Sequence, residues 1–380
     1  MQQNKPNVFS GQKLSAEDFL LNYWQQKPHL FQDTCLPVDI LPDRHQLFQL
    51  AEQEDVQSRI VYTEDNKHYQ LLHDEPQAWD TLKHLKPTLL VSDIEKWWPS
   101  ALALLDYFPF IKSWRFDDLM LSYAPTGASV GAHLDHYDVF LFQVRGTRRW
   151  QFDLQPVSDP KLVSDSDLAV LADYEPDEDH ILHPGDILYL PPQHAHHGIS
   201  TSDDCLTCSI GLRAPSHAEL LMAVAEHMAD QLSETARLQD QQKNLQADAC
   251  LSTTEINLLR SLFTKVANAS DEALAQAIGH YLSQYRSLDV MPPVETDGGK
   301  TRPTALWRIS PFYTLVSYPL NSQQMQIFID GEMTLCSEIL GTVLSSQKPF
   351  SIDIPHLSQA EKDWLDMLIE EQILITADNE

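Results

Sequence analysis

The chain has 380 residues, a hydrophobic content of 43% and a formal net charge of −29 at pH 7. This length allows two or three domains, and the hydrophobic content is sufficient for a sizeable core. A chain this acidic repels nucleic-acid phosphates and attracts basic partners such as ribosomal proteins. Charge alone does not separate this interpretation from acidity that only aids solubility.

The lack of a recognisable targeting signal and the cysteine content favour a cytoplasmic protein. The sequence has no apolar run of about eighteen residues, the length that a membrane span requires, and residues 1–13 are too polar for a signal peptide. The five cysteines are an odd number, which favours a reducing compartment. Cys205 and Cys208 lie in a predicted strand, where their spacing turns them to opposite faces, so we do not expect a redox pair.

The first third of the chain alternates short helices and strands. The predicted elements are a helix that starts at Ser15 and ends before Pro28, a strand at 29–31, a helix at 41–54, a hairpin of 59–62 and 68–72, a helix at 92–107 and a strand at 114–123. Pro99 should break or kink the helix at 92–107, because proline cannot supply the backbone N–H that a helix interior needs. Asp65 and Asn66 should form the hairpin turn.

The stretch Gly131 to Trp150 carries the first indication of chemistry. His133 and Asp135 stand two residues apart, and in an extended strand such residues point to the same face. One imidazole and one carboxylate aimed at one point are two-thirds of the 2-His-1-carboxylate site that binds non-haem Fe(II). A lone His-x-Asp pair is common by chance, as a surface histidine beside an aspartate, so a third ligand is required.

The third ligand should come from a second histidine-rich stretch, His183 to Gly198. There a Pro-Gly-Asp turn leads into an apolar strand at 187–190, and Pro191-Pro192 ends it. Three histidines follow as candidates: His194, His196 and His197. This ordered combination is much more specific than either motif alone and predicts a metal site.

Short strands without βαβ alternation predict an antiparallel barrel or jelly roll for this part of the chain. Residues 158–179 are acidic and rich in turn residues, which is typical of a surface insertion between two strands. After Pro215 the apolar spacing becomes helical, with predicted helices at 216–234, 252–267 and 270–285. Periodicity alone leaves open whether these helices pair two chains or pack on their own barrel.

The C-terminal part follows a linker predicted at 291–303. Its predicted elements are strands at 306–309, 326–329 and 373–376 and helices at 338–344 and 358–369. Such a small α+β unit resembles a winged helix. Its few basic residues argue against binding to duplex DNA, so we expect an interaction or scaffolding role.

The motifs together resemble a known family. The sequences G-A-H-L-D-H-Y-D-V-F, R-R-W, P-G-D-I-L-Y-L-P-P-Q-H-A-H-H-G and S-I-G-L-R-A-P look like those of the JmjC-type ribosomal oxygenases. The nearest likeness is the bacterial branch, whose members hydroxylate an arginine, at C-3, in a large-subunit ribosomal protein. The resemblance is tight over residues 117–215. It implies a double-stranded β-helix fold and places the metal ligands on His133, Asp135 and His196, with His194 and His197 as neighbours.

The same resemblance implies Fe(II), the co-substrate 2-oxoglutarate and O2. It assigns the distal carboxylate of 2-oxoglutarate to Arg148, and arginine suits this role because its guanidinium forms bidentate, charge-assisted pairs. Arg148 and Arg149 are adjacent on a predicted strand, so only one of them can face the interior. Ser122 and Thr207 are weaker candidates, and Thr207 departs from the asparagine that relatives often carry there.

These inferences divide the chain into a mostly β catalytic domain at 1–214, a helical dimerisation segment at 215–290 and a winged-helix-like domain at 300–380. We expect a protein hydroxylase. The alternatives are an oxygenase acting on a histidine or a small molecule, a metal cupin with other chemistry, and a binding module with a vestigial site. An arginine substrate would need a carboxylate near the metal, and the candidates are Asp117, Asp118 and Asp138.

Overall fold

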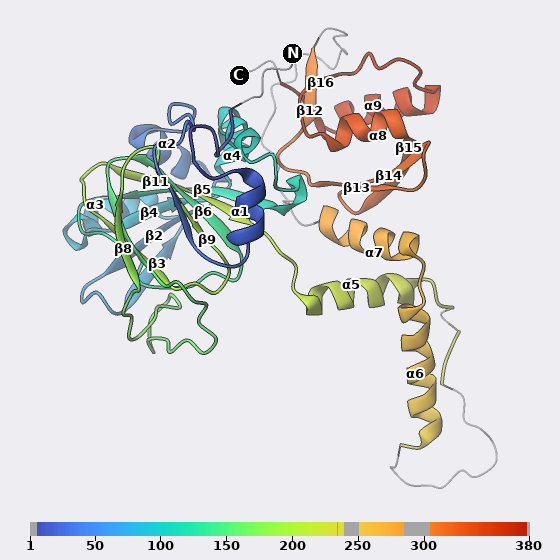
Figure 1. The fold of residues 1–380 in the computed structure, drawn as a ribbon, viewed down its shortest axis with the longest axis horizontal. Coiled ribbons are helices and arrows are strands. Elements are labelled where there is room, and N and C mark those ends of the chain that lie inside the picture. Colours follow the sequence, from blue (N-terminus) through green and yellow to red (C-terminus); the bar gives the residue numbers. More distant parts are fainter. Residues whose placement is uncertain (1–5, 234, 239–250, 285–304, 378–380) are drawn as a thin grey trace. The chain divides into compact units, whose positions relative to one another are not determined.

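The computed structural model describes residues 6–233, 235–238, 251–284 and 305–377, so the predicted links at 239–249 and 291–303 lie outside the described residues. The chain divides into two compact units, and the division falls between Ala214 and Pro215 (Figure 1). Within the described ranges, no helix is both long and apolar enough to cross a membrane.

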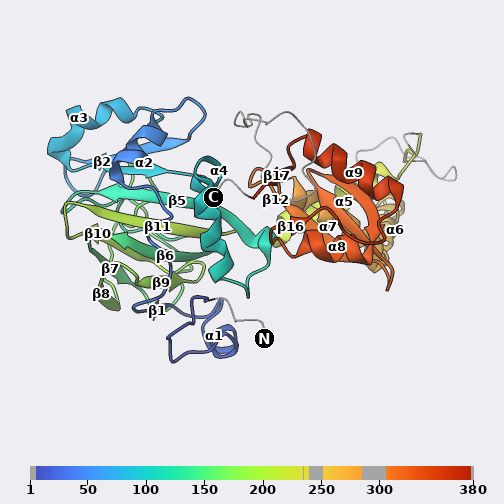
Figure 2. The same cartoon turned by 90° about the horizontal axis from the view of Figure 1, so that it is seen from above.

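Two antiparallel sheets form the first unit (Figure 2). The larger sheet has the order β1-β9-β6-β11-β5-β4-β2-β3, and the smaller has the order β10-β7-β8. Their bounds are β1 His29–Phe31, β2 Ser58–Thr63, β3 Tyr69–His73, β4 Thr88–Val91, β5 Phe116–Ala124, β6 Asp138–Arg145, β7 Arg148–Phe152, β8 Glu178–Leu182, β9 Ile187–Leu190, β10 His196–Ser200 and β11 Cys205–Leu212. This arrangement confirms the predicted jelly roll.

Alternation along β6 builds two cores. Phe140 and Phe142 turn to one face of the sheet, where they join the aromatic core that also contains Phe19 and Tyr189. Val139 and Leu141 turn to the other face and pack between the two sheets. Because successive strand residues point to opposite faces, one apolar run serves both cores.

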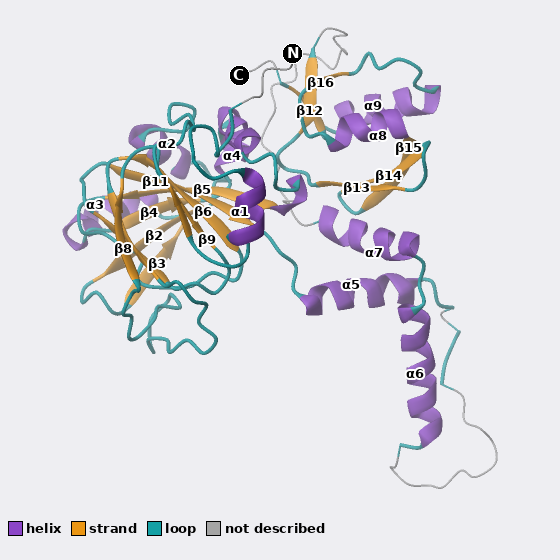
Figure 3. Cartoon of the chain, viewed as in Figure 1, coloured by secondary structure: helices purple, strands orange, loops and turns teal. Residues whose placement is uncertain are grey.

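Short helices and turns cover the outer face of the larger sheet (Figure 3). They are α1 Ala16–Asn22, α2 Arg44–Ala51, η1 Pro76–Ala78, α3 Trp79–Leu82, η2 Lys83–Leu85, α4 Ile94–Trp97, η3 Pro99–Tyr107 and η4 Ser113–Arg115. The predicted break at Pro99 is confirmed, because α4 ends before this residue and the 3-10 helix η3 begins at it. Trp114 lies in η4, so β5 starts two residues later than predicted.

The second unit contains helices and two small sheets. Its helices are α5 His217–Asp230, α6 Thr253–Ala267, α7 Asp271–Ser283, α8 Glu338–Ser345 and α9 Gln359–Glu370. Its strands are β12 Leu306–Ile309, β13 Leu315–Pro319, β14 Gln324–Ile329, β15 Glu332–Ser337, β16 Phe350–Ser351 and β17 Leu374–Thr376. Serine caps start all five helices, as Ser216 and Ser358 show with complete capping boxes. The sequence did not reveal β13, β15 and β16.

Candidate metal and co-substrate site

Three side chains converge between the two sheets of the first unit. His133, Asp135 and His196 each offer one ligand atom, and these atoms lie within 4.8 Å of one another. No other group of three or more histidine, cysteine or acidic side chains with this geometry occurs in the described part of the chain. The structure therefore brings together the three residues that the sequence predicted as ligands.

The prediction that His133 and Asp135 lie on a strand is wrong. Both precede β6, and His133 makes only an isolated bridge with His196. In this bridge the His133 N–H donates to the His196 carbonyl at 2.9 Å, and the His196 N–H donates to the His133 carbonyl at 2.8 Å. This reciprocal pair, rather than strand alternation, brings the two imidazoles side by side, with ring centroids 4.3 Å apart.

Hydrogen bonds orient both imidazoles for a metal. The Nδ1 of His133 lies 3.0 Å from the Gly131 carbonyl, and the Nδ1 of His196 lies 3.0 Å from the His194 carbonyl. A carbonyl only accepts, so each Nδ1 carries the proton and each Nε2 keeps a free lone pair. A metal-bound histidine makes this kind of second contact. The donor set of two imidazoles and a carboxylate fits Fe(II).

Burial keeps the His196 ligand neutral. Burial first, and then the neighbouring His133, lower the pKa of His196 to about 4, so its imidazole is uncharged at neutral pH. Its Nε2 lies 3.6 Å from the Asp135 carboxylate, which is too long for a direct hydrogen bond. A cation between these two atoms would satisfy both.

His194 and His197 remain outside the ligand group. The Nδ1 of His194 lies 3.0 Å from the Pro192 carbonyl. The Nε2 atoms of both residues are buried without a hydrogen-bond partner in the protein. Burial, followed by the effect of His133, lowers the pKa of His197 to about 4. The three histidines left open by the strand-and-turn pattern are thus distinguished by position, and only His196 faces His133 and Asp135.

Arg148 and Arg149 take opposite faces of β7, as alternation requires. The Arg148 side chain is buried, and its Nε and Nη2 atoms have no hydrogen-bond partner in the protein. Arg149 is exposed and its Nε donates to Asp179 at 2.7 Å. A buried guanidinium with unpaired donors is energetically costly unless an anion joins it. Arg148 thus has the burial and the free donors that a ligand carboxylate requires.

A row of polar side chains lies across the larger sheet at Ser122, Thr207 and Gln143, which are direct partners on β5, β11 and β6. The Ser122 hydroxyl donates to the Thr207 carbonyl at 3.2 Å, and the Thr207 hydroxyl donates to the Gln143 side-chain oxygen at 3.0 Å. Gln143 in turn donates to the Arg145 carbonyl at 2.8 Å. The hydroxyl protons of Ser122 and Thr207 are already donated to acceptors within the protein. Toward a ligand these hydroxyls can therefore only accept a hydrogen bond.

Trp150 contacts both Arg148 and His196. The sequence had indicated no role for it. Its ring lies 5.6 Å from the Arg148 guanidinium carbon and 5.8 Å from the His196 ring. Gly198 is its direct partner on β10, and a Cβ atom there would lie 2.6 Å from the indole. The Arg-Arg-Trp motif and the alternation of Arg148 and Trp150 could have indicated this role. Gln143, in contrast, belongs to no motif.

Asp138 is not available to a substrate, contrary to one of the sequence expectations. It is fully buried and accepts from Arg115 Nη2 at 3.0 Å, the Tyr189 hydroxyl at 2.6 Å and Gln25 Nε2 at 3.0 Å. These partners belong to the outer face of the sheet, the side that Phe140 shares. Asp138 therefore stabilises the scaffold.

Asp118 lies on the inner face of β5, which Ser122 also occupies by alternation. A Cβ atom built on Gly211 would lie 2.8 Å from the Asp118 Oδ1 atom, so the carboxylate lies over β11. Burial raises the pKa of Tyr137, and the charges of Asp135, Asp118 and Asp117 raise it further. The charges of Asp118 and Asp117 thus act on the same phenol as that of Asp135.

A jelly roll with a His-x-Asp pair and a distant histidine at its centre is the arrangement of a cupin-type metal protein, and the JmjC domain model matches residues 103–220. The chain is 32% identical over 286 residues to the Ribosomal protein uL16 3-hydroxylase of Escherichia coli, covering 74% of each protein. It is 35% identical over 227 residues to a Probable ribosomal oxygenase of Haemophilus influenzae, covering 57% of this chain and 54% of that protein. The chain belongs to the ribosomal oxygenase family.

A solved structure extends this likeness to nearly the whole chain. The E. coli ribosomal oxygenase YcfD, in complex with cobalt and 2-oxoglutarate, has a TM-score of 0.76 and 26% sequence identity. The match covers 96% of this chain and 99% of the E. coli chain. The fold predicted from the motifs therefore agrees with an experimental fold of the same family.

Proposed function

We propose that this protein is an Fe(II)- and 2-oxoglutarate-dependent oxygenase that hydroxylates an arginine, at C-3, in the ribosomal protein uL16. Two features within one barrel support this proposal most strongly: a cluster of two histidines and a carboxylate, and a buried arginine whose Nε and Nη2 have no hydrogen-bond partner in the protein. The first suits Fe(II) and the second suits a dicarboxylate. The relative named a uL16 3-hydroxylase supports the choice of substrate.

In this proposal His133, Asp135 and His196 hold the metal, and Arg148 binds the distal carboxylate of 2-oxoglutarate. Bound Fe(II), with 2-oxoglutarate and O2, supplies the oxidising power to insert oxygen into an unactivated C–H bond. The protein contributes binding and orientation. Trp150 lies against both Arg148 and His196, so it fixes the direction between the anion site and the metal site.

Ser122 and Thr207 have a supporting role in the same proposal. They form the polar row together with Gln143. Their hydroxyl oxygens can accept a hydrogen bond, but their protons are already donated within the protein. A carboxylate of 2-oxoglutarate also only accepts, so neither hydroxyl can bind it without leaving its present partner. Arg148 therefore supplies most of the binding energy for the distal carboxylate.

For the substrate, we propose that Asp118 pairs the arginine guanidinium. It shares the inner face of β5 with Ser122, and the charges of Asp118 and Asp135 both reach Tyr137. The exposed charge of the chain supports a basic protein as partner, because the net charge of −29 attracts cationic polypeptides. A ribosomal protein substrate also favours a cytoplasmic location.

We further propose that the chain forms a homodimer through the segment 216–285, of which residues 234, 239–250 and 285 lie outside the described residues. Helix α6 has no buried residue within the described part of the chain, although it is amphipathic. Its exposed apolar side chains are Ile256, Leu258, Leu259 and Phe263. Ile256, Leu259 and Phe263 are spaced three and four residues apart and form a stripe on one face of the helix. A second copy would cover this stripe, and twofold pairing is the commonest form of self-association.

Release of succinate that depends on uL16 tests the catalytic proposal. The purified chain is incubated with Fe(II), 2-oxoglutarate and O2, with and without uL16. We expect succinate production to rise strongly when uL16 is present. Succinate release that is unchanged by uL16, but stimulated by a small molecule, would favour the small-molecule alternative. No succinate at all, with metal bound, would favour a non-oxygenase cupin.

A further inference from the structure

The segment Lys161–Tyr174, hereafter the brace, belongs to the acidic insertion that the sequence indicated as a solvated surface loop. Backbone hydrogen bonds within the segment give it more regular structure than a solvated surface loop would have. Val163 N donates to the Val170 carbonyl at 2.8 Å, Ala172 N donates to the Lys161 carbonyl at 2.8 Å, and Leu162 bridges Leu171. The brace is therefore a closed loop whose two arms are hydrogen-bonded to each other.

One arm of the brace contacts both segments that carry the histidine ligands. The Leu171 N–H donates to the Ala132 carbonyl at 2.8 Å, one residue before His133. The Tyr174 hydroxyl donates to the Ala195 carbonyl at 3.1 Å, one residue before His196. Val170 packs against Gly131, and a Cβ atom added to Gly131 would lie 2.6 Å from the Val170 Cγ1. Two backbone positions adjacent to the two ligands are thus held by a single loop.

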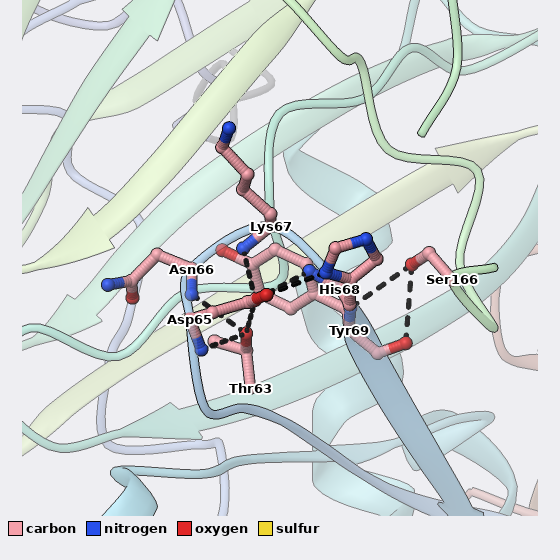
Figure 4. Close-up of polar contacts among 7 residues, drawn as sticks. All are labelled: Thr63, Asp65, Asn66, Lys67, His68, Tyr69 and Ser166. Atoms are coloured by element: carbon pink, nitrogen blue, oxygen red, sulfur yellow. Dashed lines mark hydrogen bonds and ion pairs between the residues drawn. The ribbon is translucent and has the colours of Figure 1, made fainter. Parts of the chain in front are cut away.

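The other part of the brace is anchored to β3, the edge strand of the larger sheet. Figure 4 shows Ser166 beside Tyr69, whose N–H donates to the Ser166 hydroxyl at 3.1 Å. Asp167 N donates to the Tyr69 carbonyl at 2.9 Å, and Leu71 N donates to the Asp167 carboxylate at 3.0 Å. A sheet edge offers unpaired backbone groups, and here the brace satisfies them. The anchor therefore connects the ligand segments to a rigid sheet.

The His133 segment needs such an anchor because no strand ladder supplies one, whereas His196 pairs with Phe152 on β7. His133 precedes β6 and is paired only through its isolated bridge to His196. Without further contacts, the His133 segment would be held at this end only by that bridge, while the Ala195 carbonyl also accepts from the Asp153 N–H at 2.9 Å. Tyr174 stays protonated, because burial, together with the nearby Asp153 and Asp177, raises the pKa of its phenol.

We propose that the brace positions both histidine ligands, and that Tyr174 is a positioning residue for His196. Tyr174 touches neither metal nor substrate in this proposal; it fixes the backbone from which the imidazole projects. The inference rests on the proposed metal site. Loss of a group that hydrogen-bonds a metal ligand directly lowers metal affinity by about 10- to 100-fold in other metalloproteins, and for a contact one residue before the ligand we expect the lower end of that range.

Cobalt(II) binding to the full chain tests the proposal, with Tyr174→Phe as the variant. This change removes one hydroxyl and keeps the ring. We expect the Kd for cobalt to rise by about tenfold, the visible d–d bands to change, and kcat to fall while the KM for 2-oxoglutarate stays the same. Tyr123→Phe is the matched control, because the Tyr123 hydroxyl donates to the Asp203 carbonyl at 2.9 Å, away from the brace.

Asp167→Ala provides a second variant, since it loosens the anchor at an exposed side chain. We expect a smaller rise in the cobalt Kd than in Tyr174→Phe, with the same thermal midpoint as the wild type. If Tyr174→Phe and Asp167→Ala both match Tyr123→Phe in Kd and spectrum, the brace does not position the ligands, and the metal site stands. If His196→Ala binds cobalt as tightly as the wild type, the proposed metal site itself is wrong.

Discussion

His196 and His194 are separated by one residue, yet only the first faces His133 and Asp135. We expect His196→Ala to lose metal binding and turnover, because the site then keeps only two ligands. His194→Ala is the matched control and should retain metal binding, measured by calorimetric titration with cobalt or iron under anaerobic conditions. The assignment is wrong if the control loses the metal and His196→Ala keeps it.

Arg148 and Arg149 offer a second comparison between neighbours. Arg148→Ala would leave the 2-oxoglutarate carboxylate unpaired in a buried site, at a cost of about 2–5 kcal/mol. The KM for 2-oxoglutarate should therefore rise by about 30-fold or more. Arg149→Ala should leave this KM unchanged, because its guanidinium pairs with Asp179 at the surface. The reverse result in steady-state kinetics would place the anion site on the other face of β7.

The buried histidines also predict how stability depends on pH. Burial lowers the pKa of His196 and His197 to about 4, whereas an unfolded histidine titrates near 6.5. Between these values the unfolded chain binds more protons, so stability rises with pH and falls as the pH drops from 6.5 toward 4. The thermal midpoint of the metal-free chain should follow this trend. His197→Gln should flatten it, and an equal slope in both proteins would contradict this origin.

At several of these residues the sequence was informative, for physical reasons. Alternation along β7 separates Arg148 from Arg149, and the His-x-Asp motif indicated two of the three clustered side chains. The pattern left His194, His196 and His197 open as the third, and the family resemblance chose His196. Asp138 was misplaced among the substrate candidates, although its alternation with Phe140 places both on the outer face. Gln143 and Tyr174 could not be predicted, because each gains its role only from partners distant in sequence.

Among the secondary-structure elements, α6 carries the clearest prediction about assembly. Phe263 is 56% exposed on a helix with no buried residue among those described. Phe263→Glu should convert the proposed homodimer to a monomer, because it places a charge in an apolar interface. Ser261→Glu adds the same charge to the opposite face of the helix and should remain dimeric.

Sedimentation velocity at micromolar concentration distinguishes these outcomes. A wild-type chain that sediments as a monomer would remove the dimer proposal altogether. A dimer that persists in Phe263→Glu, with the fold intact by circular dichroism, would place the interface on another surface.

Elements with a strong local signal were predicted well, and those fixed by tertiary contacts were not. The serine-capped helices α5, α6 and α7 agree with the predicted ranges to within a few residues. The hairpin β2–β3 was recognisable because Asp65 accepts from the backbone of Lys67 and His68, which stabilises the turn. Strand β10 was missed, since its histidines and glycine have no strand propensity and pairing with β7 determines their conformation.

For the molecule as a whole, the net charge of −29 should influence the encounter with a basic substrate. Exposed charges separated by more than about 10 Å are screened at 0.1 M salt. The rate of uL16 modification at low substrate concentration should therefore fall as salt is added, while the rate at saturation changes little. A salt-independent kcat/KM, measured over a range of ionic strength, would show that the acidity serves solubility only.

The central claim is tested most directly by mass spectrometry of uL16 after incubation with the chain, Fe(II), 2-oxoglutarate and O2. We expect one peptide to gain the mass of one oxygen atom, and its fragments should place that oxygen on C-3 of an arginine. His196→Ala should leave the same peptide unmodified. An added oxygen on a histidine would assign the chain to histidine hydroxylation, and unmodified uL16 from metal-loaded wild-type protein would contradict the proposed function.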